Sequence, residues 1–312
     1  MWALFVLGTA MAALDGLQRP PLDALTPRLV ERHELVAAGA LDSFRSNVAM
    51  VAGPALGGVL IAIAGLPLTY GFDMLTFVVS LVLLTRMGAV PPPPDAERPS
   101  LRGIVDGIRY ARSRQELLGT YGVDMVAMFF AMPMALFPAF ADRLGGPGVL
   151  GLLYAAPSAG ALLATVTSGW TSRVHRHGMA VILAAGAWGV GVIGFGLASD
   201  LWLALACLAF AGGADMVSGI FRTTIWNTTI PDHLRGRLAG IEQVSYASGP
   251  TLGNLRAGAL GSVIGLKASV VSGGILCVVG VAVTALLLPA FRRYDARSWT
   301  EPVADPALAP GG

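Results

Sequence analysis

Gly-Pro-Ala-Leu-Gly-Gly, residues 53–58, returns 196 residues later as Gly-Pro-Thr-Leu-Gly-Asn, residues 249–254. Each copy lies in the middle of a long apolar run and follows a loop that contains a proline, Pro27 before the first copy and Pro231 before the second. A parallel repeat with a period near 200 residues is typical of membrane transporters built from two similar helical halves. We therefore expect the chain to contain two duplicated sets of helices.

The composition is that of a membrane protein. Of the 312 residues, 54% are hydrophobic and 13% are charged, whereas a soluble domain has about a quarter of its residues charged. The formal net charge of +2 gives no basic surface for nucleic acid. The two cysteines, Cys207 and Cys277, lie inside apolar runs, so they form no disulfide framework and no metal-binding spacing.

Nine apolar runs are long enough to cross a bilayer, which requires about 20 residues per helix. This predicts an all-α polytopic helix bundle. The runs cover approximately residues 1–18, 40–64, 67–87, 117–141, 148–171, 179–198, 201–226, 238–264 and 268–291.

The distribution of arginine predicts the orientation. Alternate loops carry 15 of the 21 basic residues, whereas the loops between them carry only Arg143 and Lys267. Because basic loops stay in the cytoplasm, we expect the C-terminus inside the cell and Met1 outside. The loop 88–116 contains apolar residues at helical spacing over 101–114, which predicts an amphipathic helix on the inner membrane face.

Counting helices within the repeat predicts an incomplete first half. The second copy lies in the second-last run, so the first copy should lie in the fifth helix of its half, but one run precedes it. We expect that three helices are missing. The predicted organisation is a partial bundle of three helices (1–88), a cytoplasmic linker with the amphipathic helix (89–116), a six-helix bundle (117–291) and a disordered cytoplasmic tail (292–312).

Several stretches together resemble one transporter family. They are Pro27-Arg-Leu-Val with Glu34-Leu35 and Ala40-Leu41, the motif at 53–58, Gly107-Ile-Arg-Tyr-Ala-Arg, and Arg222 followed by Pro231-Asp-His-Leu-Arg-Gly-Arg237. On these residues the chain resembles the major facilitator superfamily, in particular its enterobactin-exporter-like and macrolide-efflux-like branch. The resemblance implies that residues 1–290 are helices four to twelve of a twelve-helix fold, and the Gly-Pro motif is associated with proton-coupled antiporters. Ser172 stands where the family usually has aspartate, which puts a gating salt bridge there in doubt.

Ionisable residues inside the predicted helices are the candidates for proton and substrate binding, because burying a charge in a bilayer costs about 2.5–3.5 kcal/mol. The candidates are Asp15, Asp73, Asp124, Asp215, Arg222 and Arg256. Counting 1.5 Å per residue predicts that Asp124 and Asp215 lie in the middle or inner half of the membrane, where a desolvated carboxylate can load and release protons. Asp15 is the third candidate. The alternative is a structural ion pair with Arg222 or Arg256.

The repeated motif has two interpretations. Pro54 and Pro250 each remove a backbone donor and favour a kink, while Gly53 and Gly57 allow close approach of another helix. Gly58 completes the first copy, and the second copy opens a stripe of small residues. The stripe comprises Gly249, Gly253, Ala257 and Gly261. It predicts either static packing or a seam at which helices bend during transport.

The leading hypothesis is a monomeric secondary transporter of the plasma membrane that exports an amphipathic small molecule, drug-like or siderophore-like, in exchange for protons. The alternative is a truncated membrane protein that transports nothing. We predict no enzyme activity, cofactor, metal site or nucleic-acid partner, since no nucleophile–base pair or metal motif is present. Gly189-x-Gly191-x-x-Gly194 matches a dinucleotide fingerprint by letter, but it lies inside an apolar helix and indicates helix packing.

Overall fold

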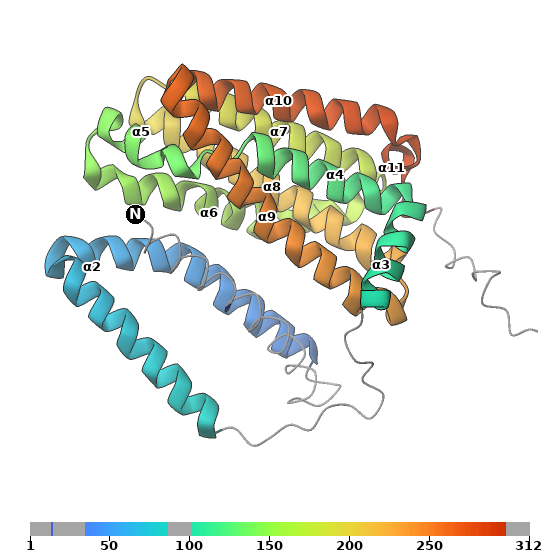
Figure 1. The fold of residues 1–312 in the computed structure, drawn as a ribbon, viewed down its shortest axis with the longest axis horizontal. Coiled ribbons are helices and arrows are strands. Elements are labelled where there is room, and N and C mark those ends of the chain that lie inside the picture. The colour runs from blue at the N-terminus through green and yellow to red at the C-terminus, as the bar shows by residue number, and fades with distance from the viewer. Residues whose placement is uncertain (1–13, 15–34, 87–100, 298–312) are drawn as a thin grey trace, which may run out of the picture. The chain divides into compact units, whose positions relative to one another are not determined.

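The computed structural model describes residues 14, 35–86 and 101–297, and every element within these ranges is helical (Figure 1). This confirms the predicted all-α fold. The chain divides into two compact units, residues 1–98 and 99–312, which we describe separately. The predicted helix at 1–18, and with it Asp15, lies outside the described residues.

The first unit contains α2 (Leu35–Arg86), which is two helices joined at a kink. Gly65 at the kink has φ 72° and ψ 169°, a backbone conformation that glycine adopts without steric cost. Pro67 follows, and proline fits the first turn of a helix because its missing N–H has no partner there. The two parts of α2 correspond to the apolar runs predicted at 40–64 and 67–87.

The second unit is a bundle of six long helical segments with shorter helices at its ends. Its elements are α3 (Leu101–Ser113), α4 (Gln115–Phe130), η2 (Met134–Leu136), α5 (Phe137–Leu144), η3 (Pro147–Val149), α6 (Leu150–Val166), η4 (Ser168–Arg173), α7 (His177–Leu197), α8 (Leu201–Thr229), α9 (Asp232–Ile264), α10 (Leu266–Leu287) and α11 (Pro289–Arg293). Helix α8 packs against both α6 and α7, α7 also packs against α10, and α4 packs against α9 and α10.

The run predicted as one helix over 117–141 is interrupted. Helix α4 ends at Phe130, and the chain resumes helical structure in η2 and α5. Pro133 accounts for the interruption, because proline lacks the backbone N–H and disfavours helical geometry in the residue before it. The carbonyl groups of the last turn of α4 therefore need partners from outside the helix.

Two short elements flank the bundle. Helix α3 occupies the position of the predicted amphipathic helix, and its Ala111 packs in a cluster with Leu117 and Trp226. After α11, the chain stays ordered to Arg297, with Tyr294 buried and the Ala296 backbone N–H donating to the His175 carbonyl at 2.9 Å. Part of the segment assigned to the tail is thus ordered, and residues 298–312 lie beyond the described range.

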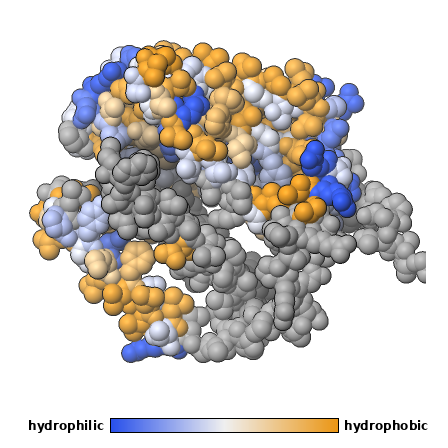
Figure 2. All heavy atoms as spheres, in the orientation of Figure 1, coloured by the Kyte–Doolittle hydropathy of each residue, from blue (hydrophilic) through white to orange (hydrophobic). Residues whose placement is uncertain are grey.

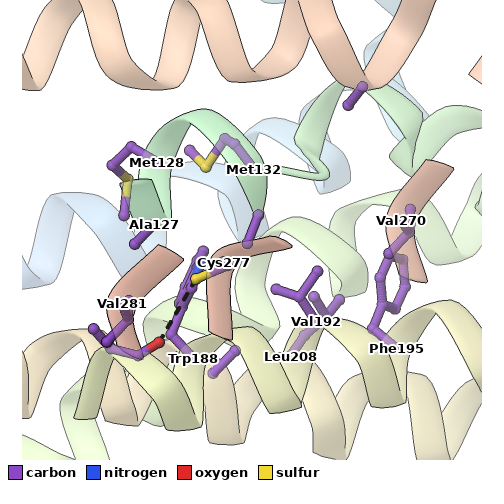
Figure 3. Close-up of a cluster of buried hydrophobic side chains, with 14 of the residues drawn as sticks. Ala127, Met128, Met132, Trp188, Val192, Phe195, Leu208, Val270, Cys277 and Val281 are labelled. Carbon is purple, nitrogen blue, oxygen red and sulfur yellow. Dashed lines mark hydrogen bonds between the residues drawn. The ribbon is translucent and has the colours of Figure 1, made fainter. Parts of the chain in front are cut away.

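An apolar core holds α4, α7, α8 and α10 together (Figure 3). Trp188 of α7 lies beside Cys277 of α10, whose thiol donates to the Ala185 carbonyl at 3.8 Å. At one end of the core, the Phe195 ring packs against the Phe137 and Phe140 rings, with centroid distances of 5.5 and 4.6 Å. Edge contacts between aromatic rings stabilise a core beyond simple burial.

The surface of the second unit fits a lipid environment. Within the described residues, five helices are long and apolar enough to cross a membrane. One of them, Pro67–Arg86, belongs to the first unit. The spans in the second unit are Gln115–Leu144, which comprises α4, η2 and α5, and His177–Leu197, Leu201–Thr229 and Leu266–Leu287. Figure 2 shows apolar side chains over much of the visible face of this unit and hydrophilic ones mainly toward its two ends. Exposed apolar surface of this extent indicates contact with lipid rather than water.

The small residues of the second motif copy form the contact between α9 and α4. A Cβ atom at Gly249 would lie 3.0 Å from the Met128 Cβ, and one at Gly253 would overlap the Met128 carbonyl. Ala257 is buried, and Gly261 faces Leu136. The stripe is therefore a site of close helix packing. Whether it also bends during transport stays a prediction.

Helix α7 contains the glycines of the dinucleotide-like pattern. A Cβ atom at Gly189 would approach the Gly274 carbonyl of α10 at 3.1 Å, and one at Gly191 would approach the Cys207 carbonyl of α8 at 3.0 Å. These glycines thus allow α7 to pack closely against its neighbours, as the sequence predicts.

We predict that Gly253→Ala destabilises the second unit by about 1–3 kcal/mol, because the added methyl group forces α9 away from the α4 backbone. The matched control is Gly258→Ala in the same helix, where a Cβ atom has nothing within 4 Å and alanine favours the helix. The measurement is the free energy of unfolding in mixed detergent micelles. Equal stability of the two variants would show that the stripe does not fix the α4–α9 distance.

Candidate functional site

The candidate site is a cluster of charged side chains on α4, α8 and α9. Asp215 and Arg222 lie seven residues apart on α8, two turns along one face of the helix. The Arg222 Nη2 atom is 3.6 Å from the Asp215 Oδ1 atom. The Arg222 side chain is buried, whereas the Asp215 side chain is 42% exposed in the described chain.

Asp124 of α4 provides the second carboxylate for Arg222. The Asp124 Oδ1 atom forms an ion pair with the Arg222 Nη1 atom, and both side chains are about 95% buried. One guanidinium group thus connects a buried carboxylate on α4 with a more open carboxylate on its own helix. Removing either partner of a buried ion pair leaves an uncompensated charge, so the three side chains form one electrostatic unit.

Helix α9 adds Glu242 and Tyr246 to this unit. Their side chains are hydrogen-bonded to each other, and both interact electrostatically with Arg222. The Arg222 Cζ atom also lies 6.0 Å from the centre of the Tyr246 ring, a cation–π arrangement. The cluster therefore carries three carboxyl groups and one guanidinium group.

Aromatic and hydroxyl side chains support the cluster on the side of Trp226, one turn after Arg222. The Trp226 indole N–H donates to the Thr120 hydroxyl at 2.8 Å, and the Trp226 ring stacks on Tyr121 with centroids 5.6 Å apart. These contacts fix α8 against α4 next to Asp124. The acidic and basic groups consequently meet on a rigid support.

The cluster retains hydrogen-bonding capacity. Arg222 Nε and the Tyr121 hydroxyl are buried and have no hydrogen-bond partner among the residues that the structure describes. Unpaired buried polar atoms are costly, and substrate or water entering the cluster would satisfy them. Within the described ranges, no group of three His, Cys, Asp or Glu side chains is placed to hold a metal ion.

The structure brings together two of the three carboxylates that the sequence favours, Asp124 and Asp215. The suggested alternative, an ion pair with Arg222, is present for both carboxylates, and their role in proton or substrate binding stays a prediction. Arg256 lies elsewhere, where it donates to the Phe129 carbonyl at 3.1 Å and to the Phe130 carbonyl. Asp73 lies on α2 in the first unit.

Glu242 and Tyr246 were missed by sequence reasoning. Glu242 lies inside the apolar run predicted at 238–264, so the rule that flags ionisable residues within a membrane helix applies to it as it does to Asp215. Tyr246 carries no comparable signal, because a tyrosine in a membrane helix is common. It belongs to the cluster through its contacts with the Glu242 carboxyl group one turn earlier and with the Arg222 guanidinium group.

Comparison with known proteins agrees with this architecture. Residues 1–310 match the family described as transmembrane secretion effector. The Enterobactin exporter EntS proteins of Shigella boydii serotype 18 and Escherichia coli O1:K1 are each 30% identical over 297 residues, which is 94% of this chain and 70% of theirs. The corresponding protein of Shigella dysenteriae serotype 1 is 30% identical over 291 residues, 92% of this chain and 69% of its own. The chain therefore belongs to the major facilitator superfamily, within the family of transmembrane secretion effectors.

Proposed function

We propose that the protein exports an amphipathic small molecule, drug-like or siderophore-like, across the inner membrane in exchange for protons. The observation that carries this proposal is the Asp124–Arg222–Asp215 cluster between apolar helices. The relatives are named as exporters of enterobactin, a siderophore, which supports the substrate class. The charged groups inside the bilayer support proton coupling, because such groups mark ion and substrate pathways.

In the proposed mechanism, Arg222 distributes its charge between two carboxylates. When Asp215, the more exposed member, is ionised, its carboxylate accepts a hydrogen bond from the substrate beside Arg222. A proton that neutralises Asp215 removes this acceptor, so that Arg222 pairs with Asp124 alone and the substrate is released. Loss of the proton restores the charge on Asp215 and draws Arg222 back. Glu242 and Tyr246 supply a further acidic group and a hydroxyl to the same space. Proton loading and substrate binding then compete for the Asp215 carboxylate, as exchange requires.

The proposal further includes an orientation, an oligomeric state and a moving contact. The arginine-rich loops lie on the cytoplasmic side together with the C-terminus, and the protein acts as a monomer. The Gly249–Gly253 contact between α9 and α4 is the seam along which these two helices shift. Because Asp124 lies on α4 and Glu242 on α9, movement at this seam would alter the cluster directly.

We predict that Asp215→Asn and Asp124→Asn each abolish proton-driven export. The Asp215→Asn amide cannot hold the exchangeable proton, and Asp124→Asn removes the carboxylate with which Arg222 pairs when Asp215 is neutral. The experiment reconstitutes the full chain in proteoliposomes and measures enterobactin movement with and without an imposed pH gradient. Asp215→Asn should fold normally, since its side chain is partly exposed. Asp142→Asn is the control, because Asp142 is exposed on α5.

The outcomes separate coupling from binding. Loss of gradient-driven export with retained downhill movement of the substrate would assign the two carboxylates to proton coupling. Full gradient-driven export by both variants would reject Asp124 and Asp215 as the proton carriers.

A further inference from the structure

An apolar groove opens between α6 and α7 over the surface of α8. Both helices pack on α8, and the space between them is a cavity of about 750 Å³. Small residues on the three helices create the space, among them Gly160, Ala184 and Gly213. The larger groove residues are Leu163, Trp170, Leu183, Phe210, Val217 and Phe221. Leu163 and Leu183 are 66% and 65% exposed, so the groove is open to its surroundings.

The groove lies on the face of α8 opposite the charge cluster. Phe210, Val217 and Phe221 line the groove, whereas Asp215 and Arg222 belong to the cluster. At 100° per residue, these two sets point in directions about 130° apart. The groove is therefore not an extension of the proposed transport site.

The length of the groove matches one leaflet of a bilayer. Along α7 it runs from Arg176 at the helix N-terminus to Ala187 near the middle of the helix, which is about 16 Å at 1.5 Å per residue. Half of a hydrocarbon core about 30 Å thick is about 15 Å. A lipid tail that begins at the level of Arg176 would reach the centre of the membrane within this groove.

A basic pocket continues the groove at its Arg176 end. This second cavity, of about 340 Å³, is lined by Arg176, Met179, Arg292, Arg293 and Asp295. Arg176 and Met179 line both cavities. The pocket combines three arginines with one aspartate and therefore favours an anion, as does the positive end of the α7 dipole beside it.

We propose that the groove and the basic pocket together bind one anionic phospholipid, with an acyl chain between α6 and α7 and the phosphate on Arg176 and Arg293. Guanidinium groups bind phosphate through paired charged hydrogen bonds, and basic pockets between membrane helices recognise anionic head groups. A free phosphate ion would leave the groove empty, and a zwitterionic lipid would gain less from the arginines. The site lies in the cytoplasmic leaflet, a placement that rests on the proposed orientation.

The test titrates the full chain, purified in detergent, with phosphatidylglycerol or phosphatidylcholine of identical acyl chains and measures bound lipid by native mass spectrometry. Phosphatidylglycerol should bind at least tenfold more tightly. Arg176→Gln with Arg293→Gln should weaken its binding about fivefold per arginine, about 25-fold for the pair. The matched control, Arg109→Gln with Arg112→Gln, removes two exposed charges from α3 and should leave binding unchanged.

A second measurement locates the acyl chain. Phosphatidylglycerol with brominated chains should quench the fluorescence of Trp170, obtained as the difference between the protein and its Trp170→Phe variant. Ala187→Phe, which fills the inner end of the groove, should reduce this quenching. Both experiments are independent of transport. Lipid binding can therefore be disproved while the proposed export function holds, and export can be disproved while lipid binding holds.

Three results would overturn the proposal. Equal affinity for the two lipids would remove the role of the basic pocket. Equal weakening by the α3 control would reduce the effect to general surface charge. Competition by millimolar inorganic phosphate with no quenching of Trp170 would leave an anion site without a lipid.

Discussion

Replacing Arg222 with methionine is expected to destabilise the second unit by about 3–5 kcal/mol and to abolish export. The methionine leaves Asp124 buried without its cation, and removing one partner of a buried ion pair costs about this amount. Asp215 is affected less, because its side chain is 42% exposed whereas that of Asp124 is buried. The loss of stability should therefore arise mainly from Asp124.

This assignment can be tested with a double-mutant cycle. Arg222→Met combined with Asp124→Leu removes both buried charges, and replacing a buried pair by apolar residues is often neutral in stability. The double variant should recover most of the lost unfolding free energy and yet remain inactive in export. Arg222→Lys should retain part of the stability, since lysine keeps the charge but lacks the fork that contacts two carboxylates.

The measurement is unfolding in mixed detergent micelles, followed by circular dichroism, together with enterobactin export in proteoliposomes. Arg109→Met on the exposed face of α3 controls for loss of an arginine as such. An Arg222→Met variant within 1 kcal/mol of the parent would show that Asp124 is satisfied without Arg222. A double variant that restores export would remove the cluster from the mechanism.

The sequence predicts the fold well because bilayer helices satisfy their backbone hydrogen bonds internally. The long apolar runs within the described residues therefore become helical, and α7, α8 and α10 have boundaries close to those predicted. The interruption after Phe130 could have been anticipated from Pro133. The partner of the freed carbonyl groups could not, because Arg256 lies more than 120 residues away in the sequence and reaches them only through the α4–α9 contact.

The candidate site was predictable in its members rather than in its connections. The cost of burying charge places Asp124, Asp215 and Arg222 among the six candidates in the sequence, together with Asp15, Asp73 and Arg256. That one guanidinium group joins the two carboxylates depends on how α4 packs against α8, which no local pattern encodes. Glu242 could have been found in the same way, because it is an ionisable residue inside a predicted membrane helix. Tyr246 could not, because its contribution depends on its position relative to Arg222.

Replacing Arg256 with methionine should have the second large effect, at the interruption between α4 and η2. The Arg256 guanidinium group donates to the carbonyls of Phe129 and Phe130 and lies 6.0 Å from the Phe130 ring centre. These carbonyls belong to the last turn of α4, where no later helical N–H is available. A positive charge at a helix C-terminus is also favourable.

We expect Arg256→Met to destabilise the second unit by about 3–5 kcal/mol, because hydrogen bonds to a charged group contribute about 1.5–3 kcal/mol each and lipid offers the carbonyls no replacement. The stability of Arg256→Lys should lie between that of the parent protein and that of Arg256→Met, since an ammonium group can reach one of the two carbonyl groups more easily than both. The matched control is Arg143→Met, which removes an exposed arginine from α5.

Gly273 provides an independent test of the same contact from α10. A Cβ atom there would overlap the Phe130 carbonyl and crowd the Arg256 Nη2 atom, so Gly273→Ala should displace the guanidinium group while leaving its charge in place. If the hydrogen bonds hold the interruption together, Gly273→Ala and Arg256→Met will both accelerate amide exchange at Ala131 and Met132. Faster exchange in Arg256→Met alone would mean that the positive charge at the end of α4, rather than hydrogen-bond geometry, stabilises the interruption. Unchanged exchange in both variants would mean that Pro133 alone determines the structure of the interruption.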